Sequence, residues 1–401
     1  MQAIICNEKF REEGCVTIPL PIPDKEYDHC LDMLERLGIG SVTARDCYID
    51  QLNGAPPCLD VLEQQSVNID ELDFLARSLD RYTDEELAKF QCAAAARDCR
   101  DLPTLINLSF CCENTTVITD FSDLEQVGKH HFLDINGGCA PTGVYDALNG
   151  VGIARELIKS GEGKVTPYGV LYENGMRLEP VYTGQSFPTY HDKAYLFETE
   201  LAPSPATPED TAPTVLFLPT PEKRLERLLE RGGYHTLEDV QIRSWCSELP
   251  AQINDCLDIP REGLIELNRM YLAVEKLKGP DMDRLAAAVL MAEPEYAMQV
   301  RHLAENLDLF DFVPNVKTPE DYGRFMIRQS GHYEYDENLA DFYDYAGYGQ
   351  RRMAQESGEF NELGYISYHG TLSLDELMLE DPAEAYRQEQ QEQGQTMGGM
   401  V

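Results

Sequence analysis

Long apolar runs are missing from this sequence of 401 residues, and their absence argues against a transmembrane protein. No stretch approaches the roughly 20 apolar residues that a helix needs to span a bilayer. The first residues, MQAIICNEKFREEG, contain no apolar core of a secretory signal peptide. The 12 cysteines form no regular framework, since all except Cys246 and Cys256 precede residue 140. We therefore expect a protein of the reducing cytoplasm that makes no membrane contact.

Positive charge is the second deficiency. Only 33 Lys and Arg residues stand against 71 Asp and Glu residues, so the formal net charge is −38. A field of this sign repels nucleic acids, membrane surfaces and other acidic proteins, and it attracts basic grooves. The hydrophobic content of 43% is enough for a folded core, which separates this chain from disordered acidic tails. We expect no direct binding to nucleic acid, while solubility or a halophilic origin remains a simpler explanation of the charge.

The motifs of common enzyme sites are also absent. No GK[ST] follows Gly150–Gly152, so this segment is not a phosphate-binding loop. The pair Cys111–Cys112 is adjacent rather than CxxC, and the pair His130–His131 near Cys139 has no second cysteine pair at zinc spacing. Asp134–Gly137 lacks the later ligands of a calcium loop. We expect no enzyme activity, cofactor or metal, and a thiol enzyme with a Cys–His nucleophile is the remaining catalytic alternative.

The sequence contains an internal repeat. The stretch Ile69–Phe132 aligns without a gap, at an offset of 195 residues, with the stretch that starts at Leu264 and continues through Met326. The matched positions are mostly apolar and helically spaced, which indicates a shared packing face, while the positions between them are mostly polar. The pairs include Leu72 with Leu267, Leu75 with Met270, Phe90 with Leu285, Leu108 with Leu303 and Gly128 with Gly323.

The expected fold class is α+β, with two tandem copies of three small modules each. In the first copy we expect strands at 3–6, 16–20 and 41–50, a helix at 25–37 capped by Asp24, and a later helix that ends before Gly128. A Pro-rich run at 202–213 is either a hairpin tip or an interdomain linker. The modules are 1–61 (α/β), 62–115 (helical) and 116–178 (α/β), then 179–263 (connector, Pro-rich run and α/β), 264–310 (helical) and 311–380 (α/β), followed by a disordered tail at 381–401.

The order of features in each copy resembles the ArdA-type antirestriction proteins of conjugative elements and phages. A strand leads to a Leu-Pro turn, Leu20-Pro21 or Leu218-Pro219, and then to a helix. The helices Glu71–Leu79 (ELxxLAxxL) and Asp84–Phe90 (DEELxxF) follow in the first copy. The second copy ends with a tyrosine-rich helix and strand, Phe342–Gly349 and Gly364–Tyr368. The resemblance covers nearly the whole chain except the Pro-rich run and the tail.

The resemblance implies a function as well as a fold. Proteins of this family are built from small α/β and helical modules strung in a line, and they form elongated, curved, acidic dimers that mimic bent B-DNA. They occupy the DNA-binding groove of type I restriction–modification enzymes of the bacterial host and so protect incoming mobile DNA. This sequence departs from the family because two copies share one chain, so it could act alone as a pseudo-dimer or form a homodimer.

A DNA mimic needs carboxylates at phosphate-like spacing on rigid elements. Duplex DNA carries one charge per 1.7 Å of axis, so a net charge of −38 matches about 65 Å, or 19 base pairs. Helices hold side chains at i, i+3 and i+4 on one face, although Asp84 and Asp123 could equally be ordinary helix caps. The candidate carboxylates are Asp80, Asp84, Glu85, Asp98, Asp101, Asp120, Asp123 and Glu125 in the first copy, and Glu275, Asp281, Asp283, Asp311, Glu320 and Asp321 in the second.

Two functions remain open at the level of sequence. The first is an antirestriction protein that imitates DNA in the groove of a type I enzyme. The second is an acidic interaction module that binds another basic protein that handles nucleic acid. Restriction–modification subunits in a pull-down from lysate would support the first, and enrichment of a different basic protein would support the second.

Overall fold

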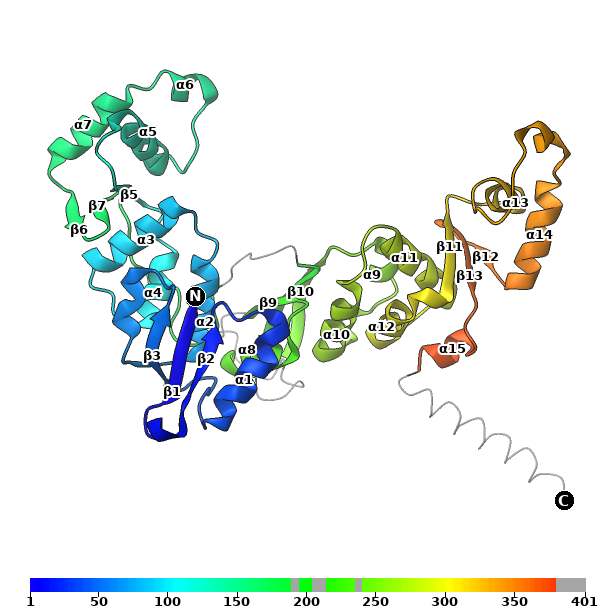
Figure 1. Cartoon of the computed structure of the whole chain (residues 1–401), viewed down its shortest axis with the longest axis horizontal. Coiled ribbons are helices and arrows are strands. Elements are labelled where there is room, and N and C mark those ends of the chain that lie inside the picture. The colour runs from blue at the N-terminus through cyan, green and yellow to red at the C-terminus, as the bar shows by residue number, and fades with distance from the viewer. Residues whose placement is uncertain (189–194, 204–213, 235–239, 380–401) are drawn as a thin grey trace. The chain divides into compact units, whose positions relative to one another are not determined.

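The computed structural model describes residues 1–188, 195–203, 214–234 and 240–379. The described residues form a mixed α+β protein whose four small sheets are all antiparallel. The chain divides into two compact units (Figure 1). Unit 1 contains Met1–Tyr190 and Lys223–His235, and unit 2 contains His191–Glu222 and Thr236–Val401. No helix in the described part is long and apolar enough to cross a membrane.

Unit 1 begins with a four-stranded sheet in the order β2-β1-β3-β4. Alternating apolar residues of β1, such as Ala3 and Ile5, face a core that also contains buried residues of the helix α1. Short 3-10 helices η1, η2 and η3 connect these elements. The bounds are β1 (Gln2–Asn7), η1 (Arg11–Glu13), β2 (Cys15–Pro19), η2 (Asp24–Glu26), α1 (Tyr27–Arg36), β3 (Cys47–Asn53), η3 (Pro57–Leu62) and β4 (Ser66–Val67).

The strand that we expected at 41–50 begins only at Cys47, so this expectation was wrong for its first half. Side chains bind the backbone of this segment and hold it as a loop. Asp46 accepts hydrogen bonds from the backbone N–H groups of Gly40 and Ser41, and the Asn68 amide donates to three carbonyls between residues 41 and 44. The helix expected at 25–37 also differs, since neither η2 nor α1 has a side-chain cap, and the Asp24 carboxylate accepts a hydrogen bond from Arg224.

Three helices form the middle of unit 1, and each starts at a side-chain cap. They are α2 (Ile69–Leu79), α3 (Asp84–Ala96) and α4 (Leu102–Ser109). Asn68 caps α2, Thr83 and Glu86 form a capping box on α3, and Asp101 caps α4. The helix expected at Glu71–Leu79 begins two residues earlier in the structure, and the helix expected at Asp84–Phe90 starts as predicted but continues to Ala96.

The last part of unit 1 is a sheet in the order β5-β7-β6 with a pair of packed helices, α5 and α7 (Figure 1). The expected end of a helix before Gly128 was wrong, because α5 continues through this glycine. Gly128 lies in the helix interior, where an added Cβ would sit 1.9 Å from the carbonyl oxygen of Gly150 on α7. The glycine therefore permits close helix packing rather than ending the helix. The bounds are β5 (Thr115–Ile118), α5 (Leu124–Ile135), α6 (Thr142–Asp146), α7 (Gly150–Ser160), β6 (Lys164–Thr166) and β7 (Gly169–Glu173).

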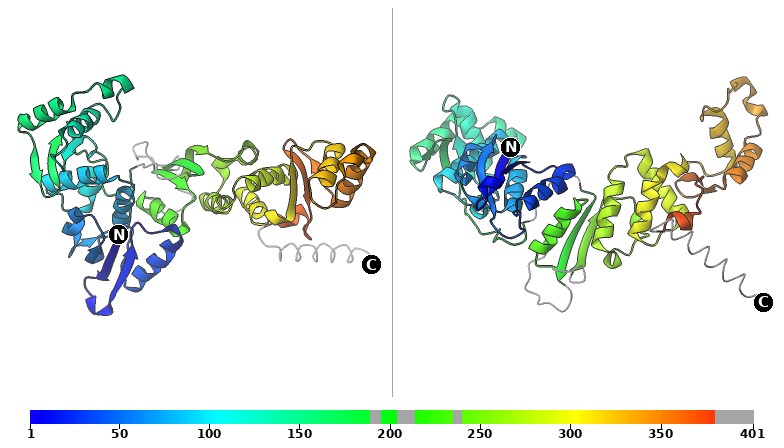
Figure 2. Two further views of the ribbon diagram at one scale, coloured as in Figure 1. Left: turned by 45° about the horizontal axis from the view of Figure 1, so that its top comes forward. Right: turned by 60° about the horizontal axis from the view of Figure 1, so that its bottom comes forward.

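Unit 2 begins with a sheet in the order β10-β8-β9, followed by helices (Figure 2). Strands β8 and β9 pair in antiparallel register, Phe197 with Leu218 and Leu201 with Thr214. The Pro-rich run therefore joins two strands of one hairpin, which favours the hairpin alternative, although 204–213 itself lies outside the described residues. The bounds are β8 (Phe197–Pro203), β9 (Thr214–Leu218), β10 (Val240–Ser247), α9 (Ala251–Asn254), η5 (Ile259–Arg261), α10 (Leu264–Val274), α11 (Pro280–Ala292), α12 (Ala297–Glu305) and η6 (Leu307–Leu309).

Unit 2 ends with a sheet in the order β11-β13-β12 and the packed helices α13 and α14. Gly323 of α13 makes the same kind of contact as Gly128, since an added Cβ would lie 1.9 Å from the carbonyl oxygen of Tyr345. The expected disordered tail lies outside the described residues. The bounds are β11 (Phe310–Pro314), α13 (Pro319–Arg328), η7 (Glu337–Phe342), α14 (Tyr345–Glu356), β12 (Glu359–Phe360), β13 (Gly364–Tyr368) and α15 (Leu374–Leu377).

The helix α8 (Glu222–Arg231) follows β9 in sequence, but its residues from Lys223 onward belong to unit 1. The sequence division assigned the whole of 179–263 to one part of the chain and did not foresee this arrangement. Three arginines of α8 contact Asp70 and Asp73 of unit 1.

Candidate protein-binding surface

The carboxylates predicted around α3 are exposed and sit at helix ends. Asp80 directly follows α2, and Asp84 is the first residue of α3, where the helix dipole favours a negative charge. Thr83, rather than Asp84, supplies the cap of α3. The Glu85 carboxylate lies 3.3 Å from the Lys89 ammonium and is therefore partly neutralised.

Asp98 and Asp101 flank the turn between α3 and α4. Asp98 has a positive φ of 52° and forms an exposed ion pair with Arg100 at 2.8 Å. Asp101 caps α4 by accepting hydrogen bonds from the backbone N–H of Thr104 at 3.0 Å and from its hydroxyl at 2.9 Å. Both carboxylates are exposed, and local hydrogen bonds fix the position of Asp101.

The predicted carboxylates near α5 have different environments. Asp120 accepts hydrogen bonds from the backbone N–H and hydroxyl of Ser122, which lower the pKa of its carboxyl. Asp123 is the cap of α5, as the simpler interpretation proposed. Glu125 is half-buried, and its carboxylate binds Lys129 and the backbone N–H of Val151 at the start of α7. These contacts lower the pKa of Glu125. The carboxylate therefore has partners on α5 and α7 of its own unit.

In unit 2, the predicted carboxylates lie at the end of α10 and in the first turn of α11. Glu275 follows α10 and is exposed, and Asp283 is exposed in the first turn of α11. Asp281 is half-buried and lies 3.5 Å from Arg284, one turn along the helix.

The last three predicted carboxylates are exposed and have local partners. Asp311 on β11 lies 3.5 Å from the His369 ring, and Glu320 pairs with Arg324 at 2.8 Å. Asp321 accepts a hydrogen bond from the hydroxyl of Thr318 at 2.6 Å, so it belongs to the cap of α13. The predicted carboxylates thus lie on helices and strands or in the segments beside them, and three of them, Asp101, Asp123 and Asp321, belong to helix caps.

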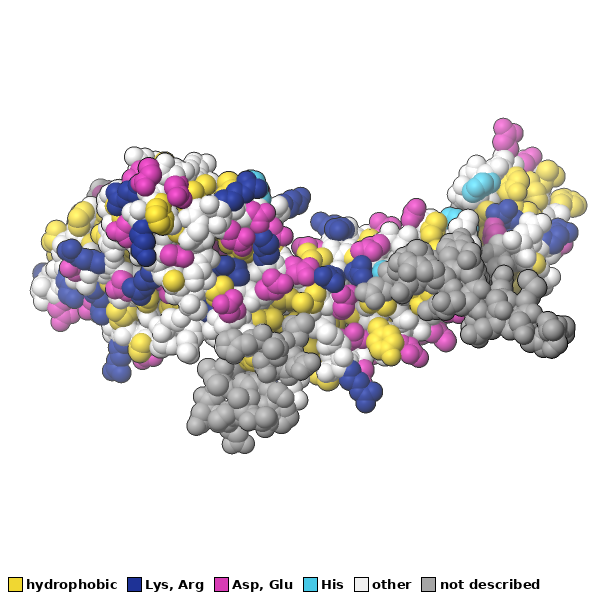
Figure 3. Space-filling model, turned by 90° about the horizontal axis from the view of Figure 1, so that it is seen from below, with side chains coloured by type: hydrophobic (Ala, Val, Ile, Leu, Met, Phe, Trp, Pro, Cys, Tyr) yellow, Lys and Arg dark blue, Asp and Glu magenta, His cyan; other side chains and the backbone are white. Residues whose placement is uncertain are grey.

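The distribution of charge on the surface is mixed. In Figure 3, Asp and Glu side chains are interspersed with Lys and Arg side chains over the visible face of the described residues. Pairing cannot remove the excess, because the net charge of −38 leaves at least that many carboxylates without an opposite charge. Within each unit, the carboxylates on this face are therefore scattered among basic side chains.

Sequence reasoning missed a buried ionic cluster in unit 1, which we call the arginine clasp. It consists of Arg224, Arg227 and Arg231 on one side of α8 with Asp70 and Asp73 on α2. Two N–H groups of Arg227 donate to the two carboxylate oxygens of Asp70 at 3.0 and 2.9 Å. Arg224 lies 3.7 Å from Asp73, and Arg231 lies 3.6 Å from Asp70.

Neutral groups complete the clasp. Arg231, whose side chain is only 2% exposed, donates to the Tyr182 hydroxyl at 2.7 Å and to the Asn68 side-chain oxygen at 2.6 Å. Arg227 also donates to the carbonyl of Gly40 at 2.9 Å. Positions 224, 227 and 231 share one helix face, so three basic residues at this spacing in a strongly acidic chain were the signal that could have revealed the cluster.

A second buried polar network joins α5 to α3 and β5. The Lys89 ammonium donates to one oxygen of Asp134 at 2.5 Å, and the Thr116 hydroxyl donates to the other at 2.7 Å. The same hydroxyl lies 2.9 Å from His131 Nδ1. Burial lowers the pKa of His131, and the nearby Asp134 only partly opposes this effect. Asp134 therefore lies on the helix α5 and binds Lys89 and Thr116, and it is not part of a calcium-binding loop.

The adjacent cysteines are buried thiols. Burial raises the pKa of Cys111, and it raises the pKa of Cys112 to about 12. Both are therefore protonated at neutral pH, whereas a nucleophilic cysteine requires the thiolate. Across the described ranges, no group of three or more His, Cys, Asp or Glu side chains is arranged to hold a metal ion.

Comparison with known proteins adds no family assignment. No model of a protein family matches this chain, and a search of curated proteins finds no significant match.

Proposed function

We propose that this chain is an antirestriction protein that binds the DNA-binding groove of a type I restriction–modification enzyme in place of DNA. The observation that carries the proposal is the net charge of −38, together with exposed carboxylates fixed at helix ends. Asp101, Asp123 and Asp321 are held by hydrogen bonds to their own helices. Fixed carboxylates lose little conformational freedom when they meet the Lys and Arg side chains that normally hold phosphates.

We also propose that the chain is an ArdA-like tandem repeat that acts as a pseudo-dimer. Support comes from the sheets, because β2-β1-β3 has the same order as β9-β8-β10. The sheet β5-β7-β6 likewise has the same order as β11-β13-β12. Each of the latter sheets is accompanied by a helix pair with a glycine contact, at Gly128 and at Gly323. A chain with two family-like copies would supply both halves of a dimeric mimic.

A DNA-cleavage assay with a purified type I enzyme tests the function directly. Increasing amounts of this chain should block cleavage, and the block should weaken as salt rises because the contacts are electrostatic. In the variant Asp80→Asn/Asp84→Asn, the slope of the logarithm of the binding constant against the logarithm of the salt concentration should become less steep by about one for each lost contact. A control with the same charge change, Glu113→Gln/Glu162→Gln, should keep the slope. No inhibition by the wild-type chain, or inhibition that is insensitive to salt, would refute the proposal.

A second candidate is an acidic module that binds another basic protein that handles nucleic acid. The mixed charges on the face shown in Figure 3 favour this alternative, since a phosphate-like row requires charge of one sign. A pull-down from bacterial lysate separates the two candidates. Recovery of restriction–modification subunits supports the first, and recovery of a different basic protein without them supports the second.

A further inference from the structure

Two cysteines lie directly opposite each other in the first hairpin of unit 1. Cys6 on β1 and Cys15 on β2 are partners in the antiparallel register of these neighbouring strands (Figure 1). The Cys6 side chain is buried, with only 2% of its surface exposed, whereas Cys15 is exposed. One thiol of the pair is therefore accessible to a reagent in solution, and the other lies just beneath the surface.

The register places this pair where the two backbones do not hydrogen-bond to each other. The backbone N–H of Leu20 donates to the carbonyl oxygen of Met1 at 2.8 Å, and the terminal ammonium of Met1 donates to the carbonyl oxygen of Leu20 at 2.7 Å. Hydrogen-bonded and non-hydrogen-bonded pairs alternate along an antiparallel ladder. Counted from this hydrogen-bonded pair, Pro19, which has no N–H, falls in a non-hydrogen-bonded pair, and so do Cys6 and Cys15.

This kind of pair suits a disulfide bond. The Cα atoms of a non-hydrogen-bonded pair lie about 4.5 Å apart, within the range of about 4.4–6.8 Å that disulfides span. Facing residues also direct their side chains to the same side of the sheet. Burial raises the pKa of the Cys6 thiol, and the neighbouring Cys15 thiol raises it further, an effect that requires the two thiols to be close.

We propose that Cys6 and Cys15 form a reversible redox site, which closes into a cross-strand disulfide when the chain meets a small-molecule disulfide such as oxidised glutathione. The inference concerns unit 1 alone and does not depend on the proposed antirestriction function. In a reducing compartment the pair rests as two thiols. Disulfides that form in such a compartment are usually transient and redox-sensing.

The bond forms through two thiol–disulfide exchanges. The exposed Cys15, as its thiolate, attacks one sulfur of oxidised glutathione, breaks that S–S bond and expels one glutathione thiolate. The Cys6 thiolate then attacks the Cys15 sulfur of the mixed disulfide and expels the second glutathione thiolate. Two protein thiols are oxidised, one glutathione disulfide is reduced, and the two cysteine protons pass to the two glutathione thiolates. The positive charge of Arg11 partly opposes the effect of burial on the pKa of Cys6, which favours the thiolate that the second step needs.

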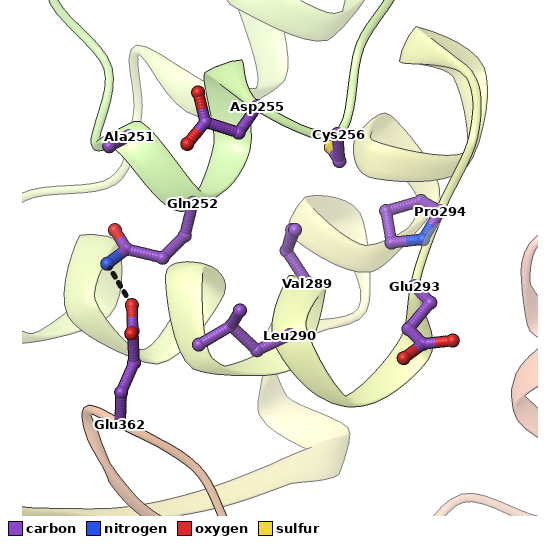
Figure 4. Close-up of a pocket in the computed structure, with 9 residues that line it drawn as sticks. All are labelled: Ala251, Gln252, Asp255, Cys256, Val289, Leu290, Glu293, Pro294 and Glu362. Atoms are coloured by element: carbon purple, nitrogen blue, oxygen red, sulfur yellow. Dashed lines mark hydrogen bonds between the residues drawn. The ribbon is translucent and has the colours of Figure 1, made fainter.

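Other cysteines of the chain have different surroundings. Cys246 on β10 is also exposed, but its partner across the sheet is Glu198. Cys256 lines a pocket between α9 and α11 in unit 2, and none of the other residues that line this pocket is a cysteine (Figure 4). Cys111 and Cys112 are both buried. The hairpin pair, in contrast, combines an exposed thiol with a second thiol directly opposite.

Mass spectrometry of the full-length chain after equilibration in glutathione redox buffers tests the site. Free thiols are alkylated under denaturing conditions, so that buried thiols also react. Trypsin cuts after Lys9, Arg11 and Lys25, so Cys6 and Cys15 fall in different peptides. Oxidised glutathione should yield these two peptides joined by a disulfide, and excess reduced glutathione should separate them. A wild-type chain that carries glutathione on Cys15 while Cys6 is alkylated would overturn the proposal.

Variants identify the second thiol of the reaction. Cys6→Ser should stop the reaction at the mixed disulfide, so glutathione on Cys15 should be at least about tenfold more abundant than in wild type, where the second step is intramolecular. Cys246→Ser removes an exposed cysteine outside the hairpin and should leave the amount of joined peptides unchanged. If Cys15 carries the same amount of glutathione in Cys6→Ser and in wild type, Cys6 does not resolve the mixed disulfide and the proposal fails. Neither result depends on whether the chain inhibits a restriction enzyme.

Discussion

The arginine clasp allows a quantitative prediction about the attachment of α8 to unit 1. Replacing Arg227 by Met keeps most of the aliphatic volume and removes the two hydrogen bonds to Asp70 and one to Gly40. The Asp70 side chain is only 11% exposed, so without Arg227 its buried carboxylate would lose two hydrogen bonds and the nearest positive charge. Breaking a buried ion pair costs about 3–5 kcal/mol, and the lower end applies because Arg231 remains 3.6 Å from Asp70.

Hydrogen–deuterium exchange of the α8 peptide measures this cost. A loss of 3 kcal/mol corresponds to exchange that is about 150-fold faster in Arg227→Met. In the double variant Arg227→Met/Asp70→Asn, the loss of unfolding free energy should be about 1–2 kcal/mol smaller than the sum of the losses in the two single variants. Arg100→Met is the control, since the exposed pair with Asp98 is worth less than about 1 kcal/mol. Unchanged exchange in Arg227→Met, or strict additivity in the double variant, would refute the reasoning.

Two further predictions concern the α5 region. Gly128→Ala should destabilise unit 1 by about 1–3 kcal/mol in urea unfolding, because the new methyl group would meet Gly150. Gly143→Ala has nothing within 4 Å and should be nearly neutral, so equal losses in both variants would argue against helix contact as the cause. Burial lowers the pKa of His131 in the folded state, so stability is complete above the unfolded pKa of about 6.5 and falls as pH drops below it. The urea midpoint should therefore fall less between about pH 7.5 and 5.5 in His131→Gln than in wild type or His130→Gln, and identical slopes would contradict the assignment.

Local signals in the sequence were sufficient to locate α2 and the start of α3. The position of α2 follows from its apolar spacing, whereas the helix expected at Asp84–Phe90 has the correct start but ends six residues before the observed end of α3 at Ala96. The errors arose where tertiary contacts override a local signal. Gly128 was interpreted as a helix end, but its place in the contact between α5 and α7 depends on a residue far along the chain. The segment before Cys47 has strand-like residues, yet hydrogen bonds from Asn68 hold it as a loop.

The candidate carboxylates could be placed from sequence only in part. Their positions at helix ends follow from the same signals that define the helices, as Asp101 and Asp123 illustrate. Their environments do not, because the partner of Glu125 is a backbone N–H on α7. The clasp was missed because Asp70 and Asp73 are far from α8 in sequence, and only the folded chain brings them together.

Salt separates the two roles that carboxylates have in this chain. Exposed carboxylates such as Asp84 interact through water, where the screening length is about 8 Å at physiological ionic strength and about 3 Å at 1 M. The Arg227–Asp70 pair is mostly excluded from solvent, so salt screens it much less. Raising NaCl toward 1 M should therefore abolish binding to a basic partner while the exchange protection of α8 remains. If protection and binding decline together, loss of structure rather than loss of surface attraction explains the salt effect, and electrostatic mimicry loses its main support.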